Sequence, residues 1–141
     1  MPVKSASAHW EGSLKEGKGT ISMESGAFDA QPYGFNTRFE DKPGTNPEEI
    51  VAAAHASCFS MALSMVLGEA GMTADSIDTE CAVTLEQKDG GFTVTGSHLK
   101  VRVAVPGAED DKVREACETA KANCPISKLL NAEITMDATI V

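Results

Sequence analysis

The stretch that decides the fold runs from Asn46 to Gly71 and reads NPEEIVAAAHASCFSMALSMVLGEAG. Asn46 is a good N-cap, Pro47 suits the first helical position, and Glu49 stands where a capping box needs its acid. Gly71 suits the left-handed residue that follows a helix, so we predict a helix from Pro47 to Glu69. Because almost every side of this helix is apolar, we expect it to be buried all round.

Strand-like segments precede and follow this helix. Before it, residues 5–23 predict a hairpin that turns near residues 16–19, and residues 31–39 predict a loop. The elements expected after it are strands at 77–87 and 92–105 joined by Asp89-Gly90-Gly91, a helix at 108–123, a short helical turn at 124–130 and a strand at 133–141. We therefore predict one α+β domain over residues 1–141, with an antiparallel sheet packed on a buried central helix.

Composition excludes several classes of function. Twelve basic and 21 acidic residues give a formal charge of -9, which is unfavourable for a nucleic acid or an anionic membrane as partner. The longest apolar region, residues 50–67, is interrupted by His55 and three serines, whereas a membrane span needs about 18 nearly unbroken apolar residues. Residues 1–6 lack a secretory signal, so we expect a cytoplasmic protein, in which disulfides are usually transient and catalytic.

Cys58 lies within the predicted buried helix, about three turns from its start. Burial among apolar groups raises the pKa of a thiol and makes it inert, so Cys58 is reactive only if a cation is brought to it. Neighbouring helix positions supply none, and the best candidate is Arg38 in the preceding loop. Glu48, ten positions before Cys58, projects to the same side of the helix and suits a bidentate clamp on an arginine. The other interpretation, which the bare sequence favours, is that Glu48 is a plain first-turn acid that complements the helix dipole.

The other cysteines differ in their surroundings. Cys124 precedes Pro125 at a helix start, where the helix terminus favours a thiolate, although an inert N-cap also fits. Cys81 on a strand and Cys117 on an apolar helix face are expected to be structural. His55, three residues before Cys58, is expected to be a core or interface histidine, because one His-x-x-Cys pair is too little for a zinc site. We expect neither a metal nor a cofactor.

The motifs around the two cysteines resemble a known family. Residues 45–59, TNPEEIVAAAHASCF, are similar to the signature of the OsmC/Ohr family of osmotically inducible and organic hydroperoxide resistance proteins, and residues 124–128, CPISK, resemble its second cysteine motif. Residues 8–12 and 31–39 resemble the OsmC branch rather than the Ohr branch. The resemblance covers essentially the whole chain.

This resemblance implies a thiol-dependent peroxidase that reduces organic hydroperoxides well and hydrogen peroxide less well. In it, Cys58 corresponds to the peroxidatic cysteine and Cys124 to the resolving one, while Arg38 and Glu48 correspond to the pair that activates the thiolate. The family fold is an intertwined homodimer with antiparallel sheets wrapped around long central helices. The expected reductant is a dithiol, such as a lipoyl-bearing protein.

Two other functions can be weighed against this one. A disulfide oxidoreductase of the thioredoxin type needs Cys-x-x-Cys beside a βαβ unit, and the sequence has neither. A stress-induced binding protein whose cysteines sense oxidants without turnover differs from a peroxidase in one measurable respect, the repeated consumption of peroxide in the presence of a dithiol.

Overall fold

A computed structural model describes all of residues 1–141. Its contacts group the chain into two compact units, Met1–Ile50 and Val51–Val141, which are described separately below. The boundary falls within one long helix, α2 (Pro47–Glu69), whose first turn belongs to the first unit. The single domain expected from the sequence remains a prediction.

The first unit is built on a three-stranded antiparallel sheet. Its strands, in the order β1-β2-β3, are β1 (Ala6–Glu11), β2 (Lys18–Met23) and β3 (Gln31–Tyr33). The expected hairpin is confirmed, but the expected loop at 31–39 is wrong, because it forms β3 and the short helix α1 (Phe35–Phe39). The Thr37 hydroxyl closes the first turn of α1 by bonding both the amide and the carbonyl of Gly34, each at 3.0 Å.

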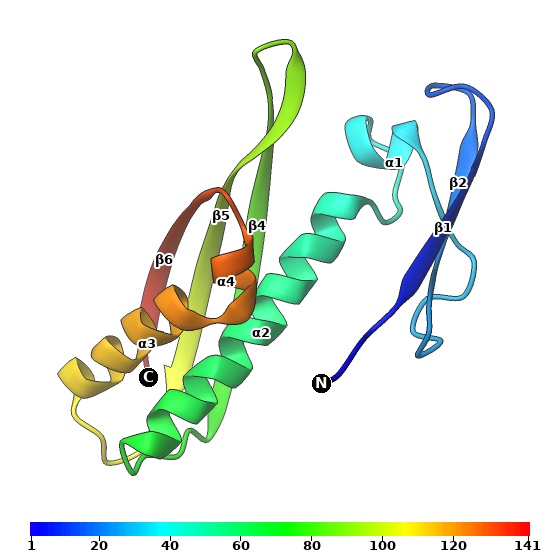
Figure 1. The fold of residues 1–141 in the computed structure, drawn as a ribbon. Coiled ribbons are helices and arrows are strands. Elements are labelled where there is room, and N and C mark those ends of the chain that lie inside the picture. Colours follow the sequence, from blue (N-terminus) through cyan, green and yellow to red (C-terminus); the bar gives the residue numbers. More distant parts are fainter. The chain divides into compact units, whose positions relative to one another are not determined.

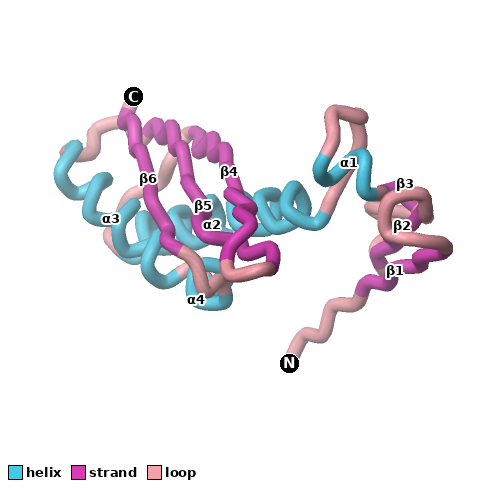
Figure 2. The backbone as a smooth tube through the Cα atoms, turned by 90° about the horizontal axis from the view of Figure 1, so that it is seen from above, coloured by secondary structure: helices cyan, strands magenta, loops and turns pink.

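The second unit has a three-stranded sheet with helices on one face (Figures 1 and 2). The sheet order is β4-β5-β6, with β4 at Ser76–Lys88, β5 at Gly91–Ala104 and β6 at Glu133–Ile140. The helices besides α2 are α3 (Asp110–Asn123) and α4 (Pro125–Leu129). Asp89 and Gly90 have φ of 52° and 81° in the turn between β4 and β5, which is the geometry that the predicted hairpin turn needs.

One strand pairing differs from expectation. β4 and β5 are antiparallel as predicted, but β6 runs parallel to β5, so this sheet is mixed. The chain leaves β5, passes through α3 and α4, and only then enters β6. A helical crossover of this kind returns the chain in the same direction and makes the two strands parallel.

The α2 helix begins and ends where the sequence predicts. The Asn46 Oδ1 atom accepts a hydrogen bond from the Glu49 amide at 2.8 Å, which caps the N-terminus. At the other end Gly71 has φ of 79°, and the Met72 amide donates to the Leu67 carbonyl at 2.8 Å. Both termini of the helix are therefore satisfied by the signals read from the sequence.

Within the second unit, however, α2 is buried on only one face. Its fully buried residues fall at every fourth position, which places them on one stripe over the β4-β5-β6 sheet: His55, Phe59, Leu63 and Leu67. Met61 and Met65 on the opposite side are 77% and 61% exposed. By length and composition this helix also passes the test for a membrane span, which core helices of soluble proteins pass as well. One sheet can cover only one side of a helix, so burial all round is not reached within the second unit.

Candidate active site

The two motif cysteines meet in the second unit although 66 positions separate them. Cys58 comes from the middle of α2, and Cys124 is the residue between α3 and α4. Their sulfur atoms lie 3.0 Å apart, and both cysteines are free thiols. A disulfide bond is about 2.05 Å long, so a shift of roughly 1 Å brings the two sulfur atoms to bonding distance.

The two thiols differ in acidity. Burial raises the pKa of Cys58, and the neighbouring Cys124 raises it further, against one backbone amide, that of Ile126, which lowers it. Burial also raises the pKa of Cys124, but hydrogen bonds from Cys58, from the Ser127 and Ile126 amides and from the Ser127 hydroxyl outweigh burial and lower it. Either sulfur can hold the proton between them, and these donors favour the thiolate on Cys124.

The two sulfurs also differ in access. Cys124 is completely buried, whereas Cys58 is partly exposed. Cys58 is therefore the sulfur that a solute can reach, and within this unit it is also the weaker acid of the two. As the sequence reasoning anticipated, the pKa of Cys58 lies above its ordinary value unless a cation is supplied.

Arg38 and Glu48 form a bidentate ion pair in the first unit. Arg38 lies in the last turn of α1, and its Nε and Nη2 atoms donate to the two carboxylate oxygens of Glu48 at 2.7 and 3.1 Å. Arg38 is 35% exposed and Glu48 only 14%. Glu48 is thus more than a first-turn acid, because both of its oxygens hold one guanidinium in a fixed plane.

Asn46 ties the arginine-bearing helix to the start of α2. Its Nδ2 atom donates to the Thr37 carbonyl of α1 at 3.0 Å, while its Oδ1 atom caps α2. One side chain therefore fixes both α1, which carries Arg38, and the helix turn that carries Glu48. The amide group is suited to this double task because it is a donor on one side and an acceptor on the other.

A buried histidine network next to Cys124 is the part of the site that the sequence did not reveal. His55 has no exposed surface, and its Nδ1 and Nε2 atoms lie 2.6 and 2.7 Å from the Ser97 and Ser127 hydroxyls. Burial lowers its pKa, so the ring is neutral near pH 7. The expectation of a core histidine is confirmed, but its partners are 42 and 72 positions away and leave no local signal.

Comparison with known proteins places this architecture in a family. A family model described as OsmC-like protein matches residues 39–139, which include both cysteines. Peroxiredoxin OsmC of Escherichia coli (strain K12) is 58% identical over 134 residues, which cover 95% of this chain and 94% of that protein. The chain belongs to the OsmC-like family.

More distant relatives of this OsmC-like chain include organic hydroperoxide resistance proteins. OhrB of Bacillus subtilis is 30% identical over 117 residues, which cover 82% of this chain and 84% of OhrB. The crystal structure of that protein superimposes with a TM-score of 0.71 at 27% identity, covering 96% of this chain and 98% of OhrB. An OsmC-like protein of unknown function from Vibrio cholerae has the same fold, with a TM-score of 0.78 at 18% identity and coverage of 99% and 100%.

The two remaining cysteines of the OsmC-like chain lie outside the sulfur pair. Cys117 is fully buried on α3 among the apolar residues that the sequence placed there, and burial raises its pKa. Cys81 on β4 is partly exposed, its sulfur lies 3.1 Å from the Ser97 hydroxyl, and burial raises its pKa as well. Both are packed thiols, as expected.

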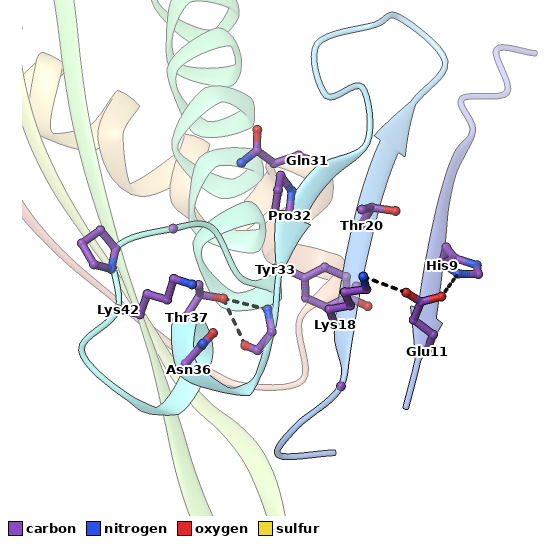
Figure 3. A pocket seen from close by; sticks show the side chains of 15 residues that line it. His9, Glu11, Lys18, Thr20, Gln31, Pro32, Tyr33, Asn36, Thr37 and Lys42 are labelled. Atoms are coloured by element: carbon purple, nitrogen blue, oxygen red, sulfur yellow. Dashed lines mark hydrogen bonds and ion pairs between the residues drawn. The ribbon is translucent and has the colours of Figure 1, made fainter. Parts of the chain in front are cut away.

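The first unit of the OsmC-like chain also has a surface hollow of about 600 Å³ (Figure 3). It is lined by β1, β2, β3 and the segment that follows α1, and Lys18 and His9 at its rim pair with Glu11 at 3.2 and 3.5 Å. Neither Arg38 nor Glu48 lines it. Lys18, His9 and Glu11 are exposed and paired with one another, and we assign no chemistry to this hollow.

Proposed function

We propose that this chain is a thiol-dependent peroxidase that reduces organic hydroperoxides to alcohols. The observation that carries the proposal is the sulfur pair, with a reachable Cys58 held 3.0 Å from a buried Cys124. The names of relatives support it, since one at 58% identity is a peroxiredoxin and another is an organic hydroperoxide resistance protein.

Access assigns the roles of the two sulfurs. A peroxide can approach only the exposed sulfur, so the Cys58 thiolate attacks the terminal oxygen and the O–O bond breaks. The alkoxide departs and takes up a proton to become the alcohol, and Cys58 is left as a sulfenic acid. Cys124 then attacks the Cys58 sulfur, and hydroxide departs and becomes water. This second step protects Cys58 from further oxidation to the sulfinic acid.

Arg38 and Glu48 supply the activation that Cys58 lacks in its own unit. In this proposal the Arg38 guanidinium, oriented by Glu48, draws the negative charge of the sulfur pair onto Cys58 and donates hydrogen bonds to the departing alkoxide. The bidentate geometry of the ion pair supports this role, because it leaves a guanidinium fixed in direction before substrate arrives.

A dithiol is the expected reductant. The Cys58–Cys124 disulfide is reduced by exchange, and a second thiol in the same reductant releases the mixed disulfide without a further collision. We propose a lipoyl-bearing protein or a similar dithiol in this role, and the cytoplasm as the compartment, where thiols are kept reduced.

We further propose that two copies of the chain pair through the uncovered face of α2. The face is apolar and contains Met61 and Met65, which are the large apolar side chains that α2 exposes. Exposed apolar patches on a helix this long are typical of interfaces, and a second copy of the same helix offers a surface of matching character. Pairing there gives α2 the burial on all sides that its sequence predicts.

Turnover of cumene hydroperoxide with dihydrolipoamide tests the proposed activity. Wild type is expected to consume many equivalents, Cys58→Ser none above background, and Cys117→Ala as much as wild type, because Cys117 is a buried thiol outside the pair. A wild type that consumes one equivalent and stops would favour the oxidant-sensing alternative. Activity that survives in Cys58→Ser would refute the proposal.

A further inference from the structure

The histidine network beside the sulfur pair reaches Cys124 through a single hydroxyl. Ser127 lies on α4, three residues and so about one helical turn after Cys124, and its hydroxyl is among the groups that lower the pKa of the Cys124 thiol. The same hydroxyl lies 2.7 Å from Nε2 of His55 on α2. The resolving cysteine is thereby connected to the buried face of the central helix.

The Nδ1 side of the His55 ring is hydrogen-bonded as well. Nδ1 of His55 lies 2.6 Å from the Ser97 hydroxyl of β5, and that hydroxyl lies 3.1 Å from the Cys81 sulfur of β4. Nδ1 itself lies 3.8 Å from the same sulfur. No charged side chain is among these hydrogen-bonding partners, and the titratable groups that meet the network are Cys58, Cys81 and Cys124.

The direction of these hydrogen bonds follows from which groups must donate. Burial keeps Cys81 a thiol and His55 neutral, so the ring has one N–H. With the proton on Nε2, Cys81 donates to Ser97, Ser97 to Nδ1, Nε2 to Ser127, and Ser127 to the Cys124 thiolate. Every hydroxyl then both donates and accepts, and bonds in such a chain strengthen one another.

We propose that His55 is a positioning residue for the resolving cysteine: its Nε2–H directs the Ser127 hydroxyl at the Cys124 sulfur for attack on oxidised Cys58. The inference rests on the proposed peroxidase cycle. In the step concerned, the Cys58–Cys124 S–S bond forms and the S–O bond of the sulfenic acid breaks. The hydroxide that leaves is neutralised by the proton that Cys124 released on ionising, so water is the net product. Cys124 is oxidised and Cys58 reduced by the same electron pair, so no further reactant is needed.

The acidity of Cys124 in a reduced Cys58→Ser background tests the Ser127 contact. Ser127→Ala is expected to raise the pKa of Cys124, measured from the pH dependence of alkylation by iodoacetamide, and Ser127→Thr is expected to restore it. Ser60→Ala is the matched control, because it removes the 2.7 Å hydrogen bond from α2 to Thr79 of β4 without touching Cys124. Equal pKa values in Ser127→Ala and the parent protein would overturn the inference.

A single-turnover experiment with both cysteines present separates this inference from the peroxidase proposal. One equivalent of cumene hydroperoxide is mixed with reduced protein, and Cys58 oxidation and disulfide formation are followed by quenching and mass spectrometry. Ser127→Ala is expected to oxidise Cys58 at least as fast as wild type, because a donor that favours the thiolate on Cys124 is lost. It is expected to form the disulfide about tenfold more slowly below the pKa of Cys124, as expected for one lost hydrogen bond to a thiolate. Failure of Cys58 to oxidise in wild type refutes the peroxidase instead, and an unchanged disulfide rate in Ser127→Ala refutes the role of the network.

The tautomer of His55 provides a readout that a purely structural histidine would not give. In the reduced Cys58→Ser protein above the pKa of Cys124, the ¹⁵N chemical shifts of His55 are expected to show the proton on Nε2. A proton on Nδ1 under these conditions would overturn the assignment. His55→Gln retains an N–H donor and is expected to keep disulfide formation within about threefold of wild type, whereas a loss as large as that of Ser127→Ala would show that a donor alone is insufficient and would contradict the stated role.

Discussion

The guanidinium of Arg38 and the carboxylate of Glu48 share two parallel hydrogen bonds, of 2.7 and 3.1 Å, across ten positions of sequence. The pair joins the end of α1 to the first turn of α2, and Glu48 is the more buried partner. A neighbouring acid in the same turn, Glu49, makes no such pair and contributes its backbone amide to the Asn46 cap. These two adjacent acids therefore provide a comparison in which only one is linked to the arginine.

Glu48→Gln is expected to lower kcat/KM for cumene hydroperoxide by roughly 10- to 100-fold, because a charge-assisted pair contributes about 1.5–3 kcal/mol more than no pair. Glu49→Gln is expected to stay within twofold of wild type. Steady-state kinetics with dihydrolipoamide measures both. Equal losses in the two variants would mean that Glu48 acts only as a first-turn acid of the helix dipole.

Arg38→Met is expected to shift the ionisation of Cys58 to higher pH. Burial raises the pKa of this thiol, so removal of the cation leaves nothing but the Ile126 amide to oppose that effect. At neutral pH the rate of Cys58 oxidation in the variant should then be lower than in wild type. The increase of this rate with pH should occur over a higher pH range than in wild type. A pH–rate profile identical to that of wild type would remove Arg38 from the activation of Cys58.

Asn46 allows the two ends of its side chain to be tested independently. Asn46→Asp keeps the Oδ1 cap of α2 but loses the donation to Thr37, so it should lower peroxidase activity with little change in stability. Asn46→Ala should also reduce the free energy of unfolding by about 1 kcal/mol, as loss of an N-cap does. Urea denaturation and steady-state rates separate the two effects, and full activity in Asn46→Asp would show that the Thr37 contact does not position Arg38.

Buried His55 predicts a loss of stability in acid. Its pKa is lowered in the folded protein, so the unfolded chain binds the extra proton first as pH falls below about 6.5. The stabilisation that neutral His55 contributes is therefore fully present above about pH 6.5. It is lost, with a slope approaching 1.4 kcal/mol per pH unit, as pH falls toward the pKa of His55 in the folded protein. The difference between wild type and His55→Gln in urea denaturation at several pH values isolates this contribution. Parallel pH dependences would contradict it.

The exposed face of α2 predicts the oligomeric state. Wild type is expected to have twice the 14.8 kDa mass of the chain by light scattering, and Met61→Glu combined with Met65→Glu is expected to shift it toward a single chain. Leu14→Glu is the control, because Leu14 is 65% exposed but lies in the β1–β2 connection. A dimer that withstands both α2 substitutions would place the contact elsewhere.

Features set by neighbouring residues could be predicted from the sequence. The bounds of α2 follow from Asn46, Pro47 and Gly71, and the turn after β4 follows from Asp89 and Gly90, because caps and tight turns are local. The helix α1 was missed because its five residues depend on contacts with Gly34 and Asn46 rather than on periodicity.

Features that depend on distant pairing could not be predicted. The direction of β6 is set by the crossover through α3 and α4, and alternation of apolar residues does not encode direction. The partners of His55 come from β5 and α4, so the residue looked like one core histidine among apolar neighbours. The sulfur pair was anticipated through the family resemblance, whereas spacing alone left open whether Cys124 is a reactive thiolate or an inert N-cap.

Peptide mass mapping of the protein after one equivalent of cumene hydroperoxide tests the proposed cycle most directly. With sulfur atoms 3.0 Å apart in the reduced protein, the expected product is a single crosslink between the peptides of Cys58 and Cys124, with Cys81 and Cys117 recovered as free thiols. Recovery of all four cysteines as thiols, or a crosslink that omits Cys58 or Cys124, would contradict the two-cysteine mechanism.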